Sequence, residues 1–306
     1  MIQKPSIFLT GGSGLLAVNW FYSMRNEYTI YLGLNEKIIN PEGGRGVQID
    51  FSSINTLYKQ LEAIQPSIII HTAGLTSVEK CENNPDLAYH INVELSTMVA
   101  NVAQQLAIPF VHISTDHLFE GNTSMISEHE PTLAINVYGQ TKALAEKAVM
   151  KINPDALIIR TNFYAWGTSY RKSFSDQIIT SLREMQTLRL FDDVYYTPIL
   201  AEKLIQTVHE LLEKKARGIF HVVSDDRISK YDFGILLADE FGLDKSFIQR
   251  ISLQSKPNLV KRPIDMSLSN QKVRDLLGQN LGTVKQHIVR LHQQEFDPNT
   301  KEIQLL

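Results

Sequence analysis

Tyr138 and Lys142 stand four residues apart in the segment NVYGQTKALAEKAV, a spacing that could support acid–base chemistry. The segment has helical periodicity, and residues four apart share one face of a helix. A lysine ammonium beside a tyrosine stabilises the phenolate and lowers the pKa of the phenol. Such a tyrosine can pass a proton to a carbonyl oxygen as a hydride arrives at carbon. The alternative is an exposed helical pair without a chemical role, because the pattern also occurs by chance.

Two hydroxyl residues stand upstream of this pair. Ser114 and Thr115 end an apolar run in the segment HISTDHLFEG. A hydroxyl there can hold a carbonyl oxygen beside the tyrosine. Hydroxyl, tyrosine and lysine therefore follow one another in an order that favours a catalytic site over a chance pattern.

A glycine-rich turn follows the first apolar run of the chain. It reads Gly11-Gly12-Ser13-Gly14-Leu15-Leu16-Ala17. Glycines at a strand-to-helix turn let the backbone approach a pyrophosphate, and the helix N-terminus supplies N–H donors. The alternative is a tight turn without a ligand. Its place after the first strand and before a helix favours a dinucleotide site.

The second strand lacks the acidic residue that usually binds the ribose diol, about 20 residues after the glycines. Gly33 stands near the strand end, with Asn35 and Glu36 after it. Without the acid a 2′-phosphate is not repelled, so the sequence favours NADPH over NADH, although Asn35 could bind a free diol. Asp50 and Phe51 end the next strand; they either contact adenine or form an ordinary strand end.

Short apolar runs alternate with helical segments in the first half of the chain, which is typical of a parallel sheet covered on both faces. The expected strands are Ser6–Thr10, Thr29–Leu32, Val47–Ile49, Ser67–His71, Phe110–Ser114, Ala156–Arg160 and Gly218–Val223. The expected helices are Ser52–Ile64, Asp86–Ala107, Tyr138–Lys151, Phe174–Arg183 and Thr197–Leu212. We therefore expect an α/β fold: a Rossmann-like, doubly wound parallel sheet with a smaller, mainly helical C-terminal substrate domain. The first domain would comprise residues 1–162 and about 190–225, the second about 163–189 and 226–306.

Composition excludes several classes of protein. A net charge of −3 without a clustered basic face does not favour nucleic-acid binding. The single cysteine, Cys81, rules out an internal disulfide and suits a reducing cytoplasm. The sequence has neither a signal peptide nor about 18 consecutive apolar residues, so we expect a cytoplasmic chain without a membrane span. The nine histidines are scattered, so no metal site is expected.

The chain resembles the extended short-chain dehydrogenase/reductase family, and within it the dTDP-4-dehydrorhamnose reductases. The likeness reaches to about Leu291 and is carried by TGGSGLLA, VQIDF, IIIHTAGLTSVEKCENNPDLAYHINV, HISTDHLFEG, NVYGQTKALAEKAV, IIRTNF, DDVYYTPI and RPIDMSLSNQKV. It implies hydride transfer from NAD(P)H to the 4-keto group of a nucleotide-linked 6-deoxyhexulose, for surface polysaccharide precursors. Dimers are the commonest assembly of soluble chains, so a homodimer is the default expectation.

The resemblance also implies roles for individual residues. Tyr138 would donate the proton, and Lys142 would bind the nicotinamide ribose and tune the tyrosine. Thr115, helped by Asp116, would polarise the sugar ketone. The remaining implied cofactor contacts are Gly11, Ser13, Gly14, Leu15, Leu16, Asn35, Asp50, Phe51, Ala73 and Gly74, with Thr76 nearby on the substrate side.

Several positions depart from the reductase pattern where the sugar would lie. His117 replaces an aromatic residue, and we interpret it as a structural or solvent-facing histidine. Phe163 takes the place of a tryptophan that packs on the sugar, and Leu75 that of a histidine. Arg262 would either contact the nucleotide diphosphate or brace the C-terminal domain.

Three other functions remain open on the sequence. A dehydratase of this family would have an Asp-Glu pair after the threonine, where this chain has Asp116-His117. A nucleotide-sugar epimerase shares the tyrosine and lysine but differs around STDHLF. A non-catalytic NADP-binding regulatory subunit, similar to the β subunit of methionine adenosyltransferase, has the same fold and similar motifs.

Overall fold

The computed structural model describes residues 4–306, which form two compact units. Unit 1 runs up to Thr115 and includes Asn136–Ile159 and Lys215–Ile219; unit 2 comprises Asp116–Ile135, Arg160–Lys214 and Phe220–Leu306. The domain boundaries expected from the sequence, with the first domain running to residue 162, stay a prediction. Within the described residues, no helix is long and apolar enough to cross a membrane.

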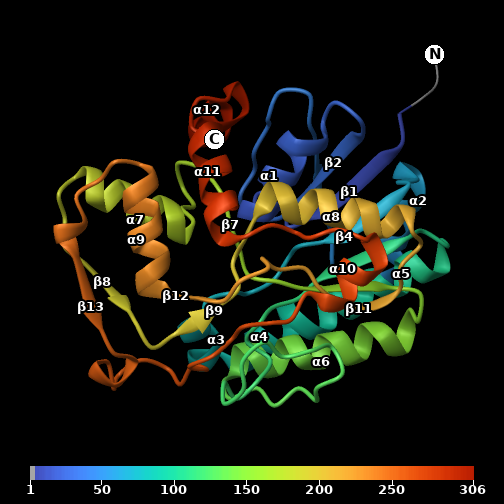
Figure 1. Cartoon of the computed structure of the whole chain (residues 1–306). Coiled ribbons are helices and arrows are strands. Elements are labelled where there is room, and N and C mark those ends of the chain that lie inside the picture. Colours follow the sequence, from blue (N-terminus) through green and yellow to red (C-terminus); the bar gives the residue numbers. More distant parts are fainter. Residues whose placement is uncertain (1–3) are drawn as a thin grey trace. The chain divides into compact units, whose positions relative to one another are not determined.

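A parallel sheet forms the centre of unit 1 (Figure 1). Among residues 4–306 it has seven strands in the order β11-β6-β5-β4-β1-β2-β3. The strands are β1 (Ser6–Thr10), β2 (Thr29–Leu34), β3 (Arg45–Gln48), β4 (Ile68–His71), β5 (Phe110–Ile113), β6 (Leu157–Arg160) and β11 (Gly218–His221). Neighbours from β6 to β3 pair in parallel. The order reverses direction at β1, as in a doubly wound sheet, and confirms the predicted Rossmann-like fold.

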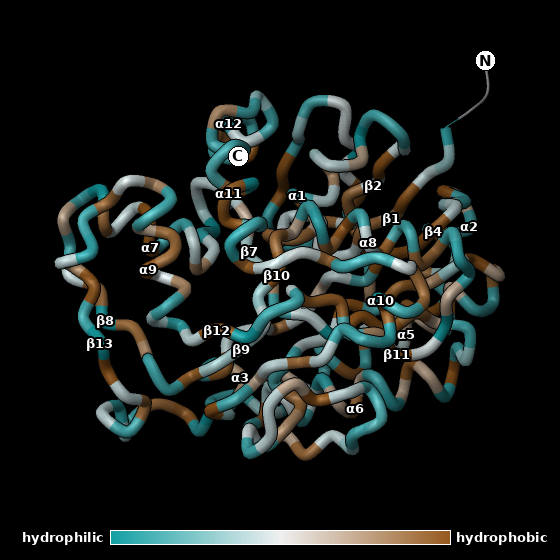
Figure 2. The backbone as a smooth tube through the Cα atoms, viewed as in Figure 1, coloured by the Kyte–Doolittle hydropathy of each residue, from teal (hydrophilic) through white to brown (hydrophobic). Residues whose placement is uncertain are grey.

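Helices cover both faces of this sheet because its central strands are mostly apolar and buried, as the brown colour of β1 and β4 in Figure 2 shows. Helix α1 (Leu15–Met24) lies on one face, and α5 (Leu95–Gln105) and α6 (Val137–Ile152) lie together on the other (Figure 1). Helix α2 (Ile54–Ile64) joins the latter face, where Leu57, Val99 and Val149 share one core cluster.

The segment expected as one helix over Asp86–Ala107 is interrupted in the structure. After α3 (Val78–Asn83) come α4 (Pro85–Tyr89), one π-helical turn η1 (His90–Glu94) and then α5. The π turn carries the fully buried Asn92. Its side chain accepts from the Leu75 backbone N–H (2.8 Å) and donates to the Leu75 carbonyl (3.1 Å) and to Thr141 Oγ1 (3.0 Å). Asn92 therefore ties the loop after β4 to helix α6.

Unit 2 is less regular than expected. Its helices are α7 (Phe174–Arg183), α8 (Ala201–Glu213), α9 (Lys230–Glu240), α10 (Gln271–Leu277), α11 (Val284–Gln294), α12 (Pro298–Leu305) and the 3₁₀ turns η2 (Lys245–Phe247) and η3 (Leu253–Ser255). Its strands are β7 (Phe163–Tyr164), β8 (Leu188–Phe191), β9 (Tyr195–Tyr196), β10 (Ile199–Leu200), β12 (Ile228–Ser229) and β13 (Ile248–Ile251). They pair as β10-β7, β12-β9 and β13-β8. Helix α8 begins later than expected because Ile199 and Leu200 pair with Phe163 and Tyr164. Such two-residue strands are too short to leave a periodic signal.

Replacing Asn92 with leucine should destabilise the protein. The substitution keeps the approximate volume but removes the partners of the Leu75 backbone and of Thr141. Unpaired buried polar groups cost about 1–3 kcal/mol each, so we expect the free energy of unfolding in urea to fall by about 2 kcal/mol or more. The control Asn101→Leu, on α5, should change it by less than about 0.5 kcal/mol. Equal effects of the two substitutions would contradict this role of Asn92.

Candidate active site

The loops after β1, β4 and β5 emerge at one edge of the sheet because these neighbouring strands are parallel. The first two loops approach each other closely at Gly11 and Ala73. Gly11 has φ +64°, and a Cβ added there would lie 2.8 Å from the Ala73 Cα. Thr72 Oγ1 donates to the Thr10 carbonyl (2.7 Å) and fixes this approach. Only glycine can occupy the turn at position 11 without displacing the loop that contains Ala73 and Gly74.

The N-terminus of α1 follows this turn. Gly14 is the N-cap, and no side chain among the described residues caps the helix. A Cβ at Gly14 would lie 2.9 Å from the Gly11 carbonyl oxygen, so the turn has no room for a side chain at this position and presents only backbone atoms. Backbone N–H groups and the helix dipole suit a pyrophosphate at this place. The turn thus fits the dinucleotide expected from the sequence, with Ser13 and Leu15 partly exposed and the Leu16 side chain in the core.

Tyr138 and Lys142 lie in the first two turns of α6, as their spacing predicts. Asn136 caps this helix by accepting from the Gly139 backbone N–H (2.9 Å). The residues Tyr138, Lys142 and, at the end of β5, Thr115 are all buried, the lysine being 5% exposed. Lys142 Nζ donates to the Ile113 carbonyl at 2.7 Å. The helix and the end of β5 therefore hold the three expected catalytic residues within unit 1.

Burial changes the protonation of Lys142. Loss of hydration lowers the pKa of its ammonium to about 8, and the nearby Glu146 carboxylate opposes this shift. Lys142 is therefore a cation at neutral pH but loses its proton more easily than an exposed lysine does. A cation one helical turn from Tyr138 stabilises the tyrosine phenolate, as acid–base chemistry requires.

The two hydroxyl residues that follow β5, Ser114 and Thr115, have different surroundings in the structure. Ser114 Oγ donates to Glu146 Oε1 at 2.5 Å, so the Ser114 hydroxyl is bound to a carboxylate. Thr115 stays the hydroxyl expected from the sequence to hold a carbonyl oxygen. Glu146 was not among the residues expected from the sequence, although its place four residues after Lys142 puts it on the same helix face.

The other cofactor candidates of unit 1 lie at the ends of β2, β3 and β4. Asn35 is exposed, and its carbonyl accepts from Gln48 Nε2 (3.0 Å). Asp50 is exposed and accepts from the Ser52 backbone N–H (2.7 Å); hydrogen bonds from the side chain and the backbone of Ser52 lower the pKa of its carboxyl. Phe51 packs against the core cluster under the sheet. Thr76 is exposed after β4. An ordinary strand end and an adenine contact both remain compatible with Asp50.

The remaining candidates, Asp116, Phe163 and Arg262, belong to unit 2. Asp116 is buried and accepts from Asn162 Nδ2 at 2.6 Å, while Phe163 pairs with Ile199 as part of β7. Arg262 lines a pocket of about 310 Å³. The residues around this pocket are cationic, imidazole or apolar: His117, Phe174, Arg189, Leu190, Phe191, Val194, Lys230, Leu253, Arg262 and Met266.

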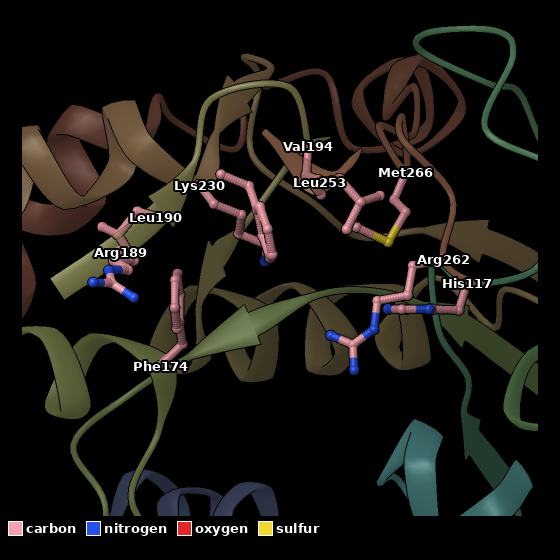
Figure 3. A pocket seen from close by; sticks show the side chains of 10 residues that line it. His117, Phe174, Arg189, Leu190, Val194, Lys230, Leu253, Arg262 and Met266 are labelled. Atoms are coloured by element: carbon pink, nitrogen blue, oxygen red, sulfur yellow. The ribbon is translucent and has the colours of Figure 1, made fainter. Parts of the chain in front are cut away.

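Positive charge converges in this pocket of unit 2. Arg262 and His117 lie next to each other, with Phe174 and Lys230 further along the wall (Figure 3). Lys230 Nζ lies 5.0 Å from the Phe174 ring centroid and 3.3 Å from that of Tyr196. Burial lowers the pKa of Lys230 to about 8 and lowers the pKa of His117. His117 thus lines a pocket and is not merely solvent-facing, and sequence reasoning missed Lys230 because a lysine at a helix start carries no distinctive pattern.

Replacing Gly11 with alanine should abolish tight binding of NADP(H). The new Cβ would push against the Ala73 backbone and shift both loops that line the proposed cofactor site. We expect the dissociation constant measured by isothermal titration to rise at least about 100-fold, which corresponds to about 2.7 kcal/mol. Gly43, at the control position Gly43→Ala, also has a positive φ (+81°) but nothing within 4 Å of an added Cβ, so the control adds backbone strain without the clash. An unchanged affinity of Gly11→Ala for NADP(H) would contradict the proposed cofactor site at this turn.

Comparison with known proteins identifies the family of this chain. The family model described as RmlD substrate binding domain matches residues 5–296. A probable low-salt glycan biosynthesis reductase of Haloferax volcanii is 30% identical over 93% of this chain and 96% of its own. The dTDP-4-dehydrorhamnose reductase of Salmonella typhimurium is 29% identical over 73% of this chain and 78% of its own.

The fold also has a solved counterpart. The structure of a dTDP-4-dehydrorhamnose reductase from Bacillus anthracis, in complex with NADP, superposes with a TM-score of 0.84 at 22% identity, over 95% of this chain and 100% of that one. Because the family match extends over residues 5–296 and the Haloferax relative covers nearly the whole chain, this protein belongs to the RmlD substrate binding domain family, as its motifs indicated.

Proposed function

We propose that this protein uses NAD(P)H to reduce the 4-keto group of a nucleotide-linked 6-deoxyhexulose, as a step in making a polysaccharide or glycan precursor. The observation that carries the proposal is the buried Lys142 ammonium, one helical turn from Tyr138 and beside the end of β5, where Thr115 lies. The family membership confirms the sequence-based prediction of an NAD(P)-dependent oxidoreductase. The sugar and its nucleotide are part of the proposal.

The roles of the residues follow from their chemistry. The cofactor supplies the hydride for the ketone carbon. Tyr138 donates its phenolic proton to the ketone oxygen, where negative charge develops. The Lys142 ammonium stabilises the tyrosinate that remains, and it has an N–H to offer to the nicotinamide ribose. The Thr115 hydroxyl donates a second hydrogen bond to the same ketone oxygen.

The pocket of unit 2 suits the nucleotide part of such a substrate. Arg262, Lys230 and Arg189 supply cations for a diphosphate, and a guanidinium binds phosphate oxygens in a bidentate way. Phe174 and Phe191 offer apolar surface for a base. Of the two roles expected for Arg262 from the sequence, we therefore propose the contact with the diphosphate.

The variant Tyr138→Phe tests the proposed reaction. It should bind NADPH with unchanged affinity, because only a hydroxyl is lost, but its kcat with dTDP-4-dehydrorhamnose should fall by about 10²–10⁴-fold. NADPH oxidation followed by absorbance gives kcat, and Tyr89→Phe, an exposed tyrosine on α4, is the matched control. Wild-type turnover in Tyr138→Phe would contradict the role of the tyrosine. NADPH binding without turnover in the wild type would instead support a regulatory, cofactor-binding protein.

Cofactor preference is a second consequence of the sequence at the end of β2. Gly33 and the exposed Asn35 place no carboxylate at the position that usually binds the adenosine ribose diol, which favours a 2′-phosphate there, although Glu36 follows. We expect isothermal titration to show tighter binding of NADPH than of NADH. The variant Asn35→Asp should reverse this order by adding the acid that favours a free diol. A preference of the wild type for NADH would overturn the assignment.

A further inference from the structure

A buried histidine pair lies beside Lys142 and has no role in the reaction described above. His112 is on β5 and His71 is on the adjacent strand β4, and both are fully buried. Their rings stack with centroids 5.5 Å apart and planes inclined by 15°. His112 Nε2 lies 3.3 Å from Lys142 Nζ. The Lys142 side chain therefore ends against the His112 ring, and the His71 ring stacks on that of His112.

The contacts of Lys142 define what His112 does. An ammonium has three N–H donors and cannot accept a hydrogen bond. One N–H goes to the Ile113 carbonyl at 2.7 Å, and His112 Nε2 is placed to accept another. One donor is then left for a ligand. A ring nitrogen can accept from an ammonium only when it carries no proton, so His112 must be neutral, with its proton on Nδ1.

The surroundings keep His112 neutral. Burial and the charge of Lys142 hold the pKa of His112 well below its usual value. Its Nδ1 is buried without a hydrogen-bond partner among residues 4–306. A buried donor left unpaired is unfavourable, and it persists where another requirement of the site outweighs it. The requirement here is an acceptor for Lys142.

His71 holds the second ring in place. Its Nδ1 contacts Thr10 Oγ1 at 2.8 Å and its Nε2 contacts Ser96 Oγ at 3.0 Å. Ser96 in turn donates to the Asn92 carbonyl at 2.6 Å. With both nitrogens engaged, the His71 ring cannot rotate, and the stacked His112 ring rests against a fixed surface.

We propose that His112 is a positioning residue: its neutral imidazole accepts a hydrogen bond from the Lys142 ammonium, holds the lysine charged and directs its remaining N–H toward the cofactor ribose. The inference rests on the proposed function for the ribose contact, but the contact with Lys142 stands independently of the substrate. Within residues 4–306, the titratable groups that face Lys142 are Tyr138 and Glu146 on α6, His112 on β5 and, beyond His112, His71 on β4.

The sign of the effect on Lys142 follows from this hydrogen bond. An acceptor for the ammonium favours the charged form, so removing the acceptor lowers the pKa of Lys142. Lys142 then loses its proton at a lower pH, and a reaction that needs the cation declines earlier on the alkaline side. A merely space-filling role for His112 would leave this alkaline limb where it is.

The test compares two substitutions of His112. His112→Leu fills the space without an acceptor, whereas His112→Gln retains an acceptor oxygen on a side chain of similar reach. The titration of Lys142 is followed by NMR of protein labelled with ¹³C at the lysine Cε, and its signal is identified by its loss in Lys142→Arg. His209→Leu, which removes a buried histidine on α8 of unit 2, is the matched control.

We expect the titration midpoint of Lys142 to fall by about one pH unit in His112→Leu, the scale of one hydrogen bond to a charged group. It should stay near the wild-type value in His112→Gln and His209→Leu. The alkaline limb of kcat should move with the midpoint, with a smaller change in the KM for substrate. An unchanged midpoint in a folded His112→Leu protein would overturn the inference. A shifted midpoint in a protein whose wild type has no reductase activity would support the role of His112 and reject the proposed reaction.

Discussion

The candidate site depends on one buried cation. Lys142 is 5% exposed, and removing an ammonium from water is costly unless acceptors replace the water. The chain supplies them from β5, through the Ile113 carbonyl and the His112 ring, and places Glu146 one turn further along α6. These groups keep the lysine charged while burial lowers its pKa to about 8. Proton donation by Tyr138 at neutral pH needs a positive charge of this kind nearby, because the charge stabilises the tyrosinate that remains.

Two further features of unit 1 hold the loops around Lys142 in place. Asn92, carried by a π turn, joins the loop after β4 to α6, and π turns often occur at functional sites. Gly11 lets the loop after β1 approach Ala73, so the proposed cofactor cradle and the catalytic helix share the same support. A small displacement of the loop after β1 or of the loop after β4 would therefore disturb both the proposed cofactor site and the catalytic helix, because close-packed protein interiors transmit strain.

The sequence predicted the parts of this design that are periodic or local. The parallel sheet follows from apolar runs between helical segments, and the Tyr138–Lys142 face follows from the helical repeat. The contacts that carry no periodic signal were missed. The Ser114–Glu146 bond and the stacking of His71 on His112 join residues that are far apart in the sequence, and the π turn at Asn92 alters a helix only locally. In unit 2, β7 and β10 were missed because they comprise two residues each.

Transfer of deuterium from NADPH labelled at the reactive C4 position of its nicotinamide, to dTDP-4-dehydrorhamnose, tests the central claim most directly. Mass spectrometry of the sugar product reports whether the hydride reaches the ketone carbon in this protein. Our account predicts a product one mass unit heavier than that made with unlabelled cofactor, and only when Tyr138 is intact. Tight NADPH binding with no deuterium in the sugar would contradict the account and leave a cofactor-binding protein without this reductase activity.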